Sequence, residues 1–124
     1  MRDENWLLKS KIQRARISDK NLGYEGSLTL DRNLMETADI YEYEKVQVVN
    51  VHNGTRLETY AIMGERGSGD VVLNGAAARW GEVGDLVIIL TYAQFEHDEI
   101  RSYQPKIVLV DENNKIKSAP AKNS

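Results

Sequence analysis

The sequence predicts an all-β fold: a closed or nearly closed barrel of six or seven short strands, with only short helices between them. Short apolar runs rich in β-branched residues recur along the chain, separated by turns that contain glycine, asparagine or aspartate. The helical patterns are short, and no strand alternates with a long helix, which argues against a doubly wound sheet. Many short strands with tight turns are typical of a barrel.

Length and composition fit one globular domain. A chain of 124 residues is long enough to bury a core and too short for two ordinary domains. The formal net charge of -3 gives no electrostatic basis for binding nucleic acid. Because cysteine is absent, disulfides, zinc thiolates and a cysteine nucleophile are excluded. The N-terminus lacks a signal-peptide core and no long apolar run exists, so we expect a cytoplasmic protein that does not enter the membrane.

The strands are expected where apolar and β-branched residues cluster, at residues 7–17, 27–31, 45–52, 56–63, 71–73, 86–92 and 105–110. Asn53-Gly54 separates two of these runs and is the strongest short hairpin signal in the chain. Glycine-containing turns are expected at 64–70 and 84–85. Residues 112–115 are expected to turn the last strand over, and residues 118–124 to form a frayed tail.

Three short helical segments are expected between the strands. Residues 31–39 form the clearest one: Asp31 is a suitable N-cap, and three apolar residues share a face at helical spacing, Leu34, Met35 and Ala38. Residues 74–80 read as a helical turn capped by Asn74, and residues 95–101 are short, polar and helix-like.

The most informative stretch is Tyr24-Glu25-Gly26-Ser27, between a polar loop and an alternating strand. Glycine adopts backbone conformations closed to other residues, including positive φ, and such a backbone exposes the Gly26 carbonyl carbon to the Ser27 hydroxyl. Attack by Oγ shifts the acyl group from nitrogen to oxygen. β-Elimination of the ester then leaves dehydroalanine, and hydrolysis with loss of ammonia leaves a pyruvoyl group. The alternative is an ordinary Gly-Ser turn.

A second cluster is Arg56-Leu57-Glu58-Thr59-Tyr60. On a strand, Arg56, Glu58 and Tyr60 point to one face and the other two residues to the opposite face. Arg56 presents a planar charged fork suited to a carboxylate, and Tyr60 is able to donate a proton to a developing carbanion. The same pattern also describes an ordinary amphipathic hairpin strand with a cross-strand ion pair.

A third cluster is Asn74-Gly75-Ala76-Ala77-Ala78. Small residues after a capping asparagine leave backbone N–H groups open to an anion or an oxyanion. A tightly packed helix start explains the same residues.

Other candidates have less support. Lys11 is suited to anchoring a carboxylate, although it lies on a charged strand. His52 and His97 lack metal-like spacing, and Glu96, Asp98 and Glu99 look like a solvated face. The glycines of 64–69 do not have the spacing of a nucleotide-binding loop.

Taken in order, these pieces resemble the aspartate 1-decarboxylase family over residues 8–110. The stretches that carry the resemblance are Lys11, Tyr24-Glu25-Gly26-Ser27, Asn53-Gly54-Thr55-Arg56, Thr59-Tyr60, Glu65-Arg66-Gly67, Asn74-Gly75-Ala76-Ala77-Ala78 and Val83-Gly84-Asp85-Leu86-Val87-Ile88-Ile89. The resemblance implies a double-psi β-barrel and a homotetramer with active sites between subunits. It implies self-cleavage at Gly26-Ser27 into chains 1–26 and 27–124. The cofactor would be a pyruvoyl group from Ser27, with no metal and no pyridoxal phosphate.

The resemblance also assigns roles to residues. The substrate would be L-aspartate, joined to the pyruvoyl group as an imine, and the product β-alanine for pantothenate biosynthesis. Thr59 would assist the acyl shift, and Tyr60 would protonate the decarboxylated intermediate. The substrate-binding residues would be Lys11, Arg56, Asn74, Gly75, Ala76 and Ala77.

Two features depart from the simplest form of this hypothesis. The family often has histidine two residues after the lysine, where this chain has Gln13. Thr59 and Tyr60 point to opposite faces of a regular strand, so both act at one site only through a bulge or between subunits. Two alternatives stay open: a pyruvoyl-dependent decarboxylase of another amino acid, and a non-catalytic β-barrel binding module in which Gly26-Ser27 stays intact.

Overall fold

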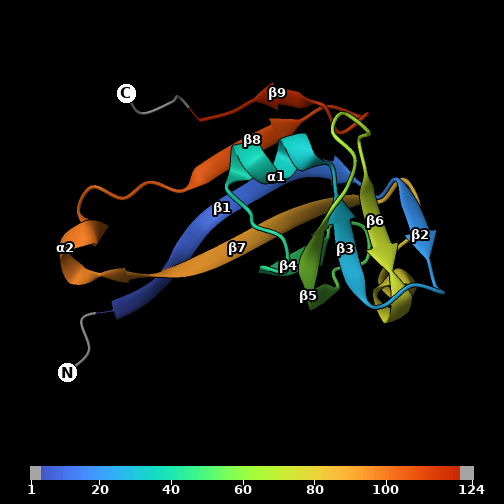
Figure 1. The fold of residues 1–124 in the computed structure, drawn as a ribbon, viewed down its shortest axis with the longest axis horizontal. Helices are drawn as coiled ribbons and strands as arrows, with labels where there is room; N and C mark the ends of the chain where they lie inside the picture. The colour runs from blue at the N-terminus through green and yellow to red at the C-terminus, as the bar shows by residue number, and fades with distance from the viewer. Residues whose placement is uncertain (1–3, 121–124) are drawn as a thin grey trace.

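The computed structural model describes residues 4–120, which form nine strands in one sheet (Figure 1). The strand order is β2-β6-β3-β5-β4-β7-β1-β8-β9. The bounds are β1 Glu4–Arg16, β2 Asp19–Asn21, β3 Ser27–Leu30, β4 Lys45–Asn50, β5 Arg56–Met63, β6 Val71–Asn74, β7 Leu86–Glu96, β8 Lys106–Val110 and β9 Ile116–Ser118. The helices are short: α1 Arg32–Ala38, η1 Gly75–Trp80 and α2 His97–Ile100. The all-β prediction is confirmed.

Two short strands were missed by the sequence prediction of six or seven. β2 and β9 have three residues each, Asp19-Lys-Asn and Ile116-Lys-Ser, and most of these residues are exposed. Each is the terminal strand of the sheet and is held by backbone pairing to one neighbour, so neither carries the burial pattern that marks a strand in sequence. The expected tail from 118 to 124 begins at the last residue of β9, and residues 121–124 lie outside the described range.

The longest pairing joins β1 and β7, which run side by side across the molecule in Figure 1. The antiparallel register extends from Glu4↔Glu96 to Arg16↔Leu86, so β7 continues four residues beyond its predicted end at 92. β1 also pairs in parallel with β8. Both edges of β1 are therefore hydrogen-bonded, and the N-terminal strand lies in the interior of the sheet.

The core is formed by the inward-facing residues of the strands and by one face of α1. On α1 the buried residues are Leu34, Met35 and Ala38, as the spacing predicts. The largest fully buried strand residues are Ile12, Leu28, Leu30, Val46, Val71, Leu73, Val87, Ile89 and Val108. Burying a side chain of this size contributes about 1.5–3 kcal/mol, which makes this cluster the main source of stability.

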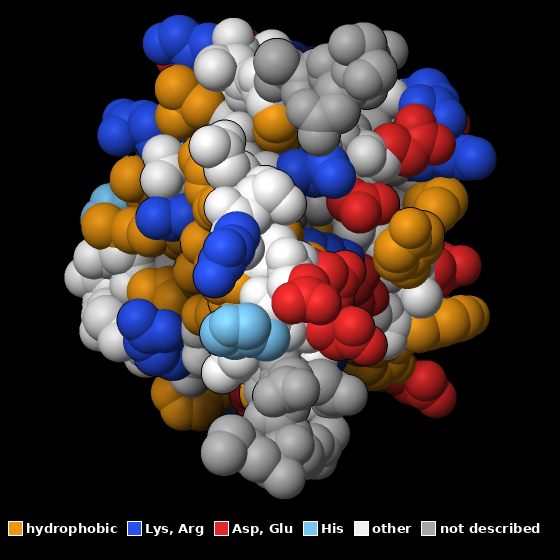
Figure 2. All heavy atoms as spheres, turned by 90° about the vertical axis from the view of Figure 1, so that its left-hand side faces the viewer, with side chains coloured by type: hydrophobic (Ala, Val, Ile, Leu, Met, Phe, Trp, Pro, Cys, Tyr) orange, Lys and Arg blue, Asp and Glu red, His pale blue; other side chains and the backbone are white. Residues whose placement is uncertain are grey.

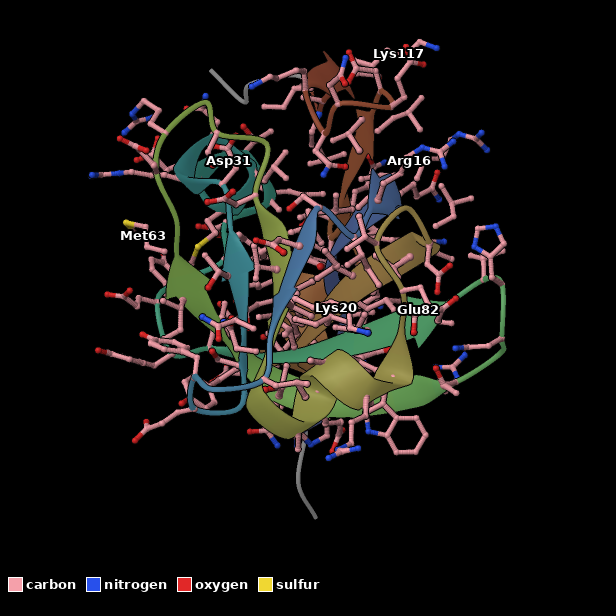
Figure 3. All side chains as sticks on the ribbon, turned by 90° about the vertical axis from the view of Figure 1, so that its right-hand side faces the viewer. Arg16, Lys20, Asp31, Met63, Glu82 and Lys117 are labelled. Carbon is pink, nitrogen blue, oxygen red and sulfur yellow. The ribbon has the colours of Figure 1, made fainter. Side chains whose placement is uncertain are left out.

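Asp31 joins the end of β3 to the loop between β5 and β6. Its side chain is buried and accepts hydrogen bonds from the backbone N–H groups of Asn33 at 2.8 Å, Gly67 at 3.0 Å and Gly69 at 2.9 Å. Figure 3 shows Asp31 between α1 and that loop. Burial raises the pKa of Asp31, but the three N–H donors outweigh it and the pKa lies below its ordinary value. The predicted N-cap is confirmed, and the same carboxylate fixes β3 relative to its neighbours.

Asn114 brings the two ends of the strand order together. Its Oδ1 accepts from Arg16 N at 2.8 Å, and its Nδ2 donates to the carbonyls of Arg16 and Gly69, each at 2.8 Å. Gly69 precedes β6, near one end of the order, whereas Asn114 precedes β9 at the other. The sheet therefore curls on itself, as expected of a barrel, while the double-psi connection pattern stays a prediction. No helix within residues 4–120 is long and apolar enough to cross a membrane.

Candidate active site

Ser27 is the first residue of β3 and is fully buried. Its Oγ donates a hydrogen bond to the carbonyl of Glu25 at 3.2 Å and accepts one from Asn74 Nδ2 at 2.9 Å. The hydroxyl therefore lies on the N-terminal side of its own residue, toward the Gly26 peptide that it would attack. Buried serine hydroxyls normally have hydrogen-bond partners, but here both partners flank the predicted cleavage bond.

The glycine with the unusual conformation is Gly75, rather than Gly26. Among residues 4–120 the glycines with positive φ are Gly54, Gly67, Gly69, Gly75 and Gly84, so Gly26 does not use the positive φ that is open to glycine. Gly75 has φ of 61°, and a Cβ built on it would lie 2.6 Å from Gly26 N, 2.6 Å from Tyr24 O and 2.8 Å from Gly26 Cα. The segment before the cleavage bond therefore rests on a surface that only glycine provides.

Asn74 is positioned by the antiparallel pairing of β6 with β3, in which it lies directly opposite Ser27. It occupies the N-cap position of η1, but its side chain makes no capping hydrogen bond. The predicted capping role is therefore wrong. Instead Nδ2 donates to Ser27 Oγ at 2.9 Å and to Thr29 Oγ1 at 2.8 Å. The pairing directs the amide across the sheet, where the two hydroxyls accept both of its hydrogens.

The small residues after Asn74 form a packed turn. Gly75, Ala77 and Ala78 are buried, whereas Ala76 is exposed. The turn is a 3-10 helix of six residues. This arrangement matches the packed helix start considered above, and it brings the backbone of Gly75 directly against Gly26.

Strand β5 places Tyr60 beside the start of β3. The parallel register pairs Leu28 with Ala61, so Ser27 and Tyr60 occupy the preceding position on each strand and share a face. Tyr60 packs near Tyr43, with ring centroids 6.3 Å apart. The β4–β5 pairing runs in unbroken register from Lys45↔Tyr60 to Val49↔Arg56. Thr59 therefore lies on the opposite face from Tyr60, and the structure has no bulge there to bring the two side chains together.

Arg56 lies on the same face of β5 as Tyr60 and is exposed. Its Nη1 donates to Gln47 Oε1 at 3.0 Å, and Tyr92 OH donates to the same oxygen at 3.2 Å. The cross-strand ion pair considered in the sequence also exists, between Lys45 Nζ and Glu58 at 3.7 Å, but it is exposed and contributes little to stability.

A largely apolar hollow of about 510 Å³ adjoins this face. It is lined by Trp6, Glu44, Lys45, Val46, Gln47, Glu58 and Tyr92. Gln47, the partner of Arg56, forms part of its wall. An apolar hollow beside the Arg56 guanidinium is typical of a surface that binds a ligand or a partner chain.

Lys11 is half-buried on β1, with Leu90 of β7 and Ile107 of β8 as its neighbours. In the sheet, β5, β4 and β7 lie between β3 and β1, so Lys11 is four strand positions from Ser27. Gln13 is on the same face of β1 and pairs with Leu109. The structure therefore brings together Gly26, Ser27, Asn74, Gly75 and Tyr60, and it leaves Lys11 apart within one chain.

Sequence reasoning missed two residues that contact the candidate site residues: Thr29, which accepts from Asn74, and Gln47, which accepts from Arg56. Thr29 reads as an ordinary strand residue, and its contact with Asn74 spans 45 positions. Its only available signal was the alternation that puts Ser27 and Thr29 on one face. Gln47 also had no distinguishing signal, because it lies within a strand of β-branched residues.

The remaining candidates lie away from this cluster. His52 Nδ1 accepts from Leu86 N at 3.0 Å and lies 3.5 Å from Asp85. His97 begins α2, and Figure 2 shows a histidine beside acidic side chains at that end of the molecule. There Glu96 and Glu99 form a capping box, a local structural role. Within residues 4–120 no group of three or more potential ligands is placed to hold a metal ion.

Comparison with known proteins identifies a family and relatives that match most of the chain. The profile of the family described as Aspartate decarboxylase matches residues 4–117. Among relatives named Aspartate 1-decarboxylase, that of Thermoanaerobacter pseudethanolicus is 56% identical over 112 residues, covering 90% of this chain and 96% of the relative. That of Syntrophobacter fumaroxidans is 59% identical, covering 88% of each. That of Acetivibrio thermocellus is 58% identical, covering 89% of this chain and 87% of the relative.

The match to the family profile spans most of the chain, and residues 4–117 include the Gly26-Ser27 bond, β5 and the turn after Asn74. On sequence, fold and site together, the chain belongs to the aspartate decarboxylase family.

Proposed function

We propose that this protein decarboxylates L-aspartate to β-alanine and CO2 in the cytoplasm, for pantothenate biosynthesis, with a pyruvoyl group made from its own Ser27. The observation that carries this proposal is the buried Ser27 hydroxyl, held between Asn74 Nδ2 and the Glu25 carbonyl beside a Gly-Ser bond. The name of the relatives supports the same substrate.

The residues around Ser27 suit each step of self-cleavage. Oγ attacks the Gly26 carbonyl carbon, the C–N bond breaks, and the free amine of Ser27 takes up the hydroxyl proton. In the ester, loss of the Cα proton breaks the Cβ–Oγ bond and releases Gly26 as a carboxylate. Water then replaces nitrogen at Cα, and ammonia leaves. Asn74 Nδ2 donates to Oγ, the atom that leaves with negative charge, so this hydrogen bond strengthens as the charge develops.

The space around Gly26 also suits the new C-terminus that cleavage of the Gly26-Ser27 bond would create. Gly75 has no side chain where Gly26 and Tyr24 approach it, so the cut end has room against the backbone of the turn. A pyruvoyl group at position 27 would supply the electron sink that decarboxylation of an amino acid needs. Tyr60, on the face of Ser27, would deliver a proton to the carbon that lost CO2.

Arg56 would hold the carboxylate that the substrate keeps. Strong binding of the departing carboxylate would stabilise the ground state and so slow the reaction. Binding of the side-chain carboxylate is the same in the ground state and the transition state, so it carries no such cost. The planar fork of arginine also selects an acid over an amide, because a neutral side chain would leave the guanidinium without a counter-charge.

Thr59 would assist the acyl shift from the opposite face of β5. Gly26 lies in the bend just before β3, and its carbonyl oxygen is the atom on which negative charge develops when Ser27 attacks. A small hydroxyl is able to donate a hydrogen bond to that oxygen as it becomes an oxyanion.

We further propose a homotetramer in which Lys11 acts at the site of a neighbouring copy. Lys11 lies on β1 and Ser27 on β3, two strands that do not pair and that have β5, β4 and β7 between them in the strand order. The apolar hollow beside Arg56, together with exposed Tyr41 and Tyr43, would be covered by the second copy.

Mixing inactive variants tests this arrangement. Lys11→Ala and Ser27→Ala chains produced together would restore part of the activity, because some sites combine an intact Lys11 with an intact Ser27. Complete inactivity of hybrids that are shown to contain both chains would place the two residues in the same subunit.

Intact mass under denaturing conditions tests the proposed function most directly. We expect fragments 1–26 and 27–124, the second lighter than a serine-started chain by the mass of ammonia. Ser27→Ala is the control and should stay uncleaved. An uncleaved wild-type chain would favour the binding module, and a free N-terminal serine would indicate mere hydrolysis. Cleaved protein that releases CO2 from another amino acid, and not from aspartate, would assign a different substrate.

A further inference from the structure

Thr29 is joined to the cleavage site through Asn74. Ser27 and Thr29 are two positions apart on β3 and point to the same face, and Asn74 lies across from Ser27 on β6. One amide nitrogen therefore donates to both hydroxyls, at 2.9 Å to Ser27 Oγ and 2.8 Å to Thr29 Oγ1. An amide nitrogen has two hydrogens, so this pair of acceptors uses its whole donor capacity.

This arrangement fixes which end of the amide faces Ser27. The single hydroxyl hydrogen of Ser27 is donated to the Glu25 carbonyl, so Oγ has to accept from Asn74. If the amide turned over, Oδ1 would face Ser27 and compete for that hydrogen. Thr29 Oγ1 accepts the second hydrogen of Nδ2 at 2.8 Å and so anchors the nitrogen end of the amide beside Ser27 Oγ.

We propose that Thr29 is a positioning residue for self-cleavage: it holds the Asn74 amide so that Nδ2 donates to Ser27 Oγ. This inference rests on the proposed function. In the elimination step the electron pair of the Cβ–Oγ bond moves to Oγ, and the Cα proton passes to water. Thr29 touches none of the reacting atoms. It acts only by holding Asn74 Nδ2, which donates to Oγ as negative charge develops there.

Three variants test the link. In Thr29→Val the shape is kept and the acceptor is lost, so one buried N–H is left unpaired or the amide turns over. We expect cleavage roughly tenfold slower, the size of one lost buried hydrogen bond. Thr29→Ser keeps the hydroxyl and should cleave at close to the wild-type rate.

Thr91→Val is the matched control. Thr91 is also buried, and its hydroxyl is hydrogen-bonded to Ser10 between β7 and β1, remote from the cleavage bond in strand order. This variant loses a hydrogen bond of the same kind and should cleave normally. A wild-type cleavage rate in Thr29→Val would overturn the proposal. Cleavage slowed equally in Thr91→Val and Thr29→Val would also overturn it, because the cause would then be a general loss of stability.

The side-chain amide of Asn74 gives a second measurement that does not depend on cleavage. For ¹⁵N NMR both chains carry Ser27→Ala, so that neither is cleaved and Thr29 Oγ1 is the acceptor that remains. The side-chain amide hydrogens of Asn74 should then exchange several-fold faster when Thr29→Val is added. Equal exchange in both chains would overturn the link. If wild-type protein is not cleaved at all, the proposed function fails, and this measurement still decides whether Thr29 orients the amide.

Discussion

Replacing Gly75 with alanine tests whether the turn after Asn74 supports the cleavage bond. The new Cβ would lie 2.6 Å from Gly26 N and from Tyr24 O, and 2.8 Å from Gly26 Cα. All three are backbone atoms, so no side chain is able to rotate out of the way. The residue also keeps a φ of 61°, in the left-handed region that alanine rarely adopts.

The size of the effect follows from these two costs. Left-handed alanine costs about 1 kcal/mol relative to glycine, and forcing an extra methyl group into packed surroundings costs about 1–3 kcal/mol. The free energy of unfolding should therefore fall by roughly 2–4 kcal/mol. Since Gly26 has to move away from Gly75, cleavage should be slowed about a hundredfold, the usual effect of a displacement near 1 Å between reacting groups.

Gly67→Ala separates the two costs. Gly67 has a similar φ of 79°, but a Cβ there has no atom within 4 Å. In Gly67→Ala the free energy of unfolding should fall by only about 1 kcal/mol, and cleavage should proceed normally. Stability is measured by urea unfolding with each change placed in the Ser27→Ala chain, which stays in one piece, and cleavage by gel in the Ser27 chain. Equal stabilities of the two alanine variants, with wild-type cleavage in Gly75→Ala, would refute the argument.

Four further changes have defined outcomes. Tyr60→Phe should mature normally but form β-alanine about a hundred- to ten-thousandfold more slowly, and an uncleaved Tyr60→Phe chain would contradict the assigned role. Arg56→Lys should cleave and lose most activity on aspartate, because the charge remains but the fork geometry is lost; equal activity would remove Arg56 from the site. Thr59→Val should accumulate uncleaved chain on a gel, whereas maturation at the normal rate would exclude its help in the acyl shift. The pKa of Asp31 is lowered on folding, so its stabilising effect is complete above its ordinary value of 3.8 and is lost as pH falls through the folded value. Asp31→Asn should therefore flatten the decrease in urea stability below about pH 4, and parallel pH profiles would contradict this.

The sequence predicted those parts of the fold whose signals are local. Asn53-Gly54 marks the hairpin between β4 and β5, and Asp31 caps α1, because each depends on residues a few positions away. The alternation along β5 correctly separated Tyr60 from Thr59, since side chains of a strand alternate whatever the strand pairs with.

The rest of the site depends on pairings between distant segments. Asn74 has the residue type and position of a helix cap, and only the alignment of β6 with β3 shows that its amide is used on two hydroxyls instead. The sequence suggested Gly26 as the residue with backbone freedom, including positive φ, because it precedes the serine. The structure gives that conformation to Gly75, 49 positions later, because the two backbones approach each other there. Composition and periodicity carry no information about such approaches.

The interior position of β1 has a consequence for a chain that cuts itself after Gly26. After the proposed cleavage the fragment 1–26 would keep a 13-residue strand hydrogen-bonded to β7 on one edge and β8 on the other, so it should stay bound as a separate peptide. Unfolding of a cleaved chain would separate residues 1–26 from residues 27–124 as well as one subunit from another. The denaturation midpoint should therefore depend more steeply on protein concentration than that of Ser27→Ala, which loses only the contacts between subunits. Refolding of a cleaved protein would require the peptide to find its partner again. The proposed cleavage would thus turn an intramolecular sheet into a noncovalent complex, whereas a chain that folds before it is cut forms the same sheet without an association step.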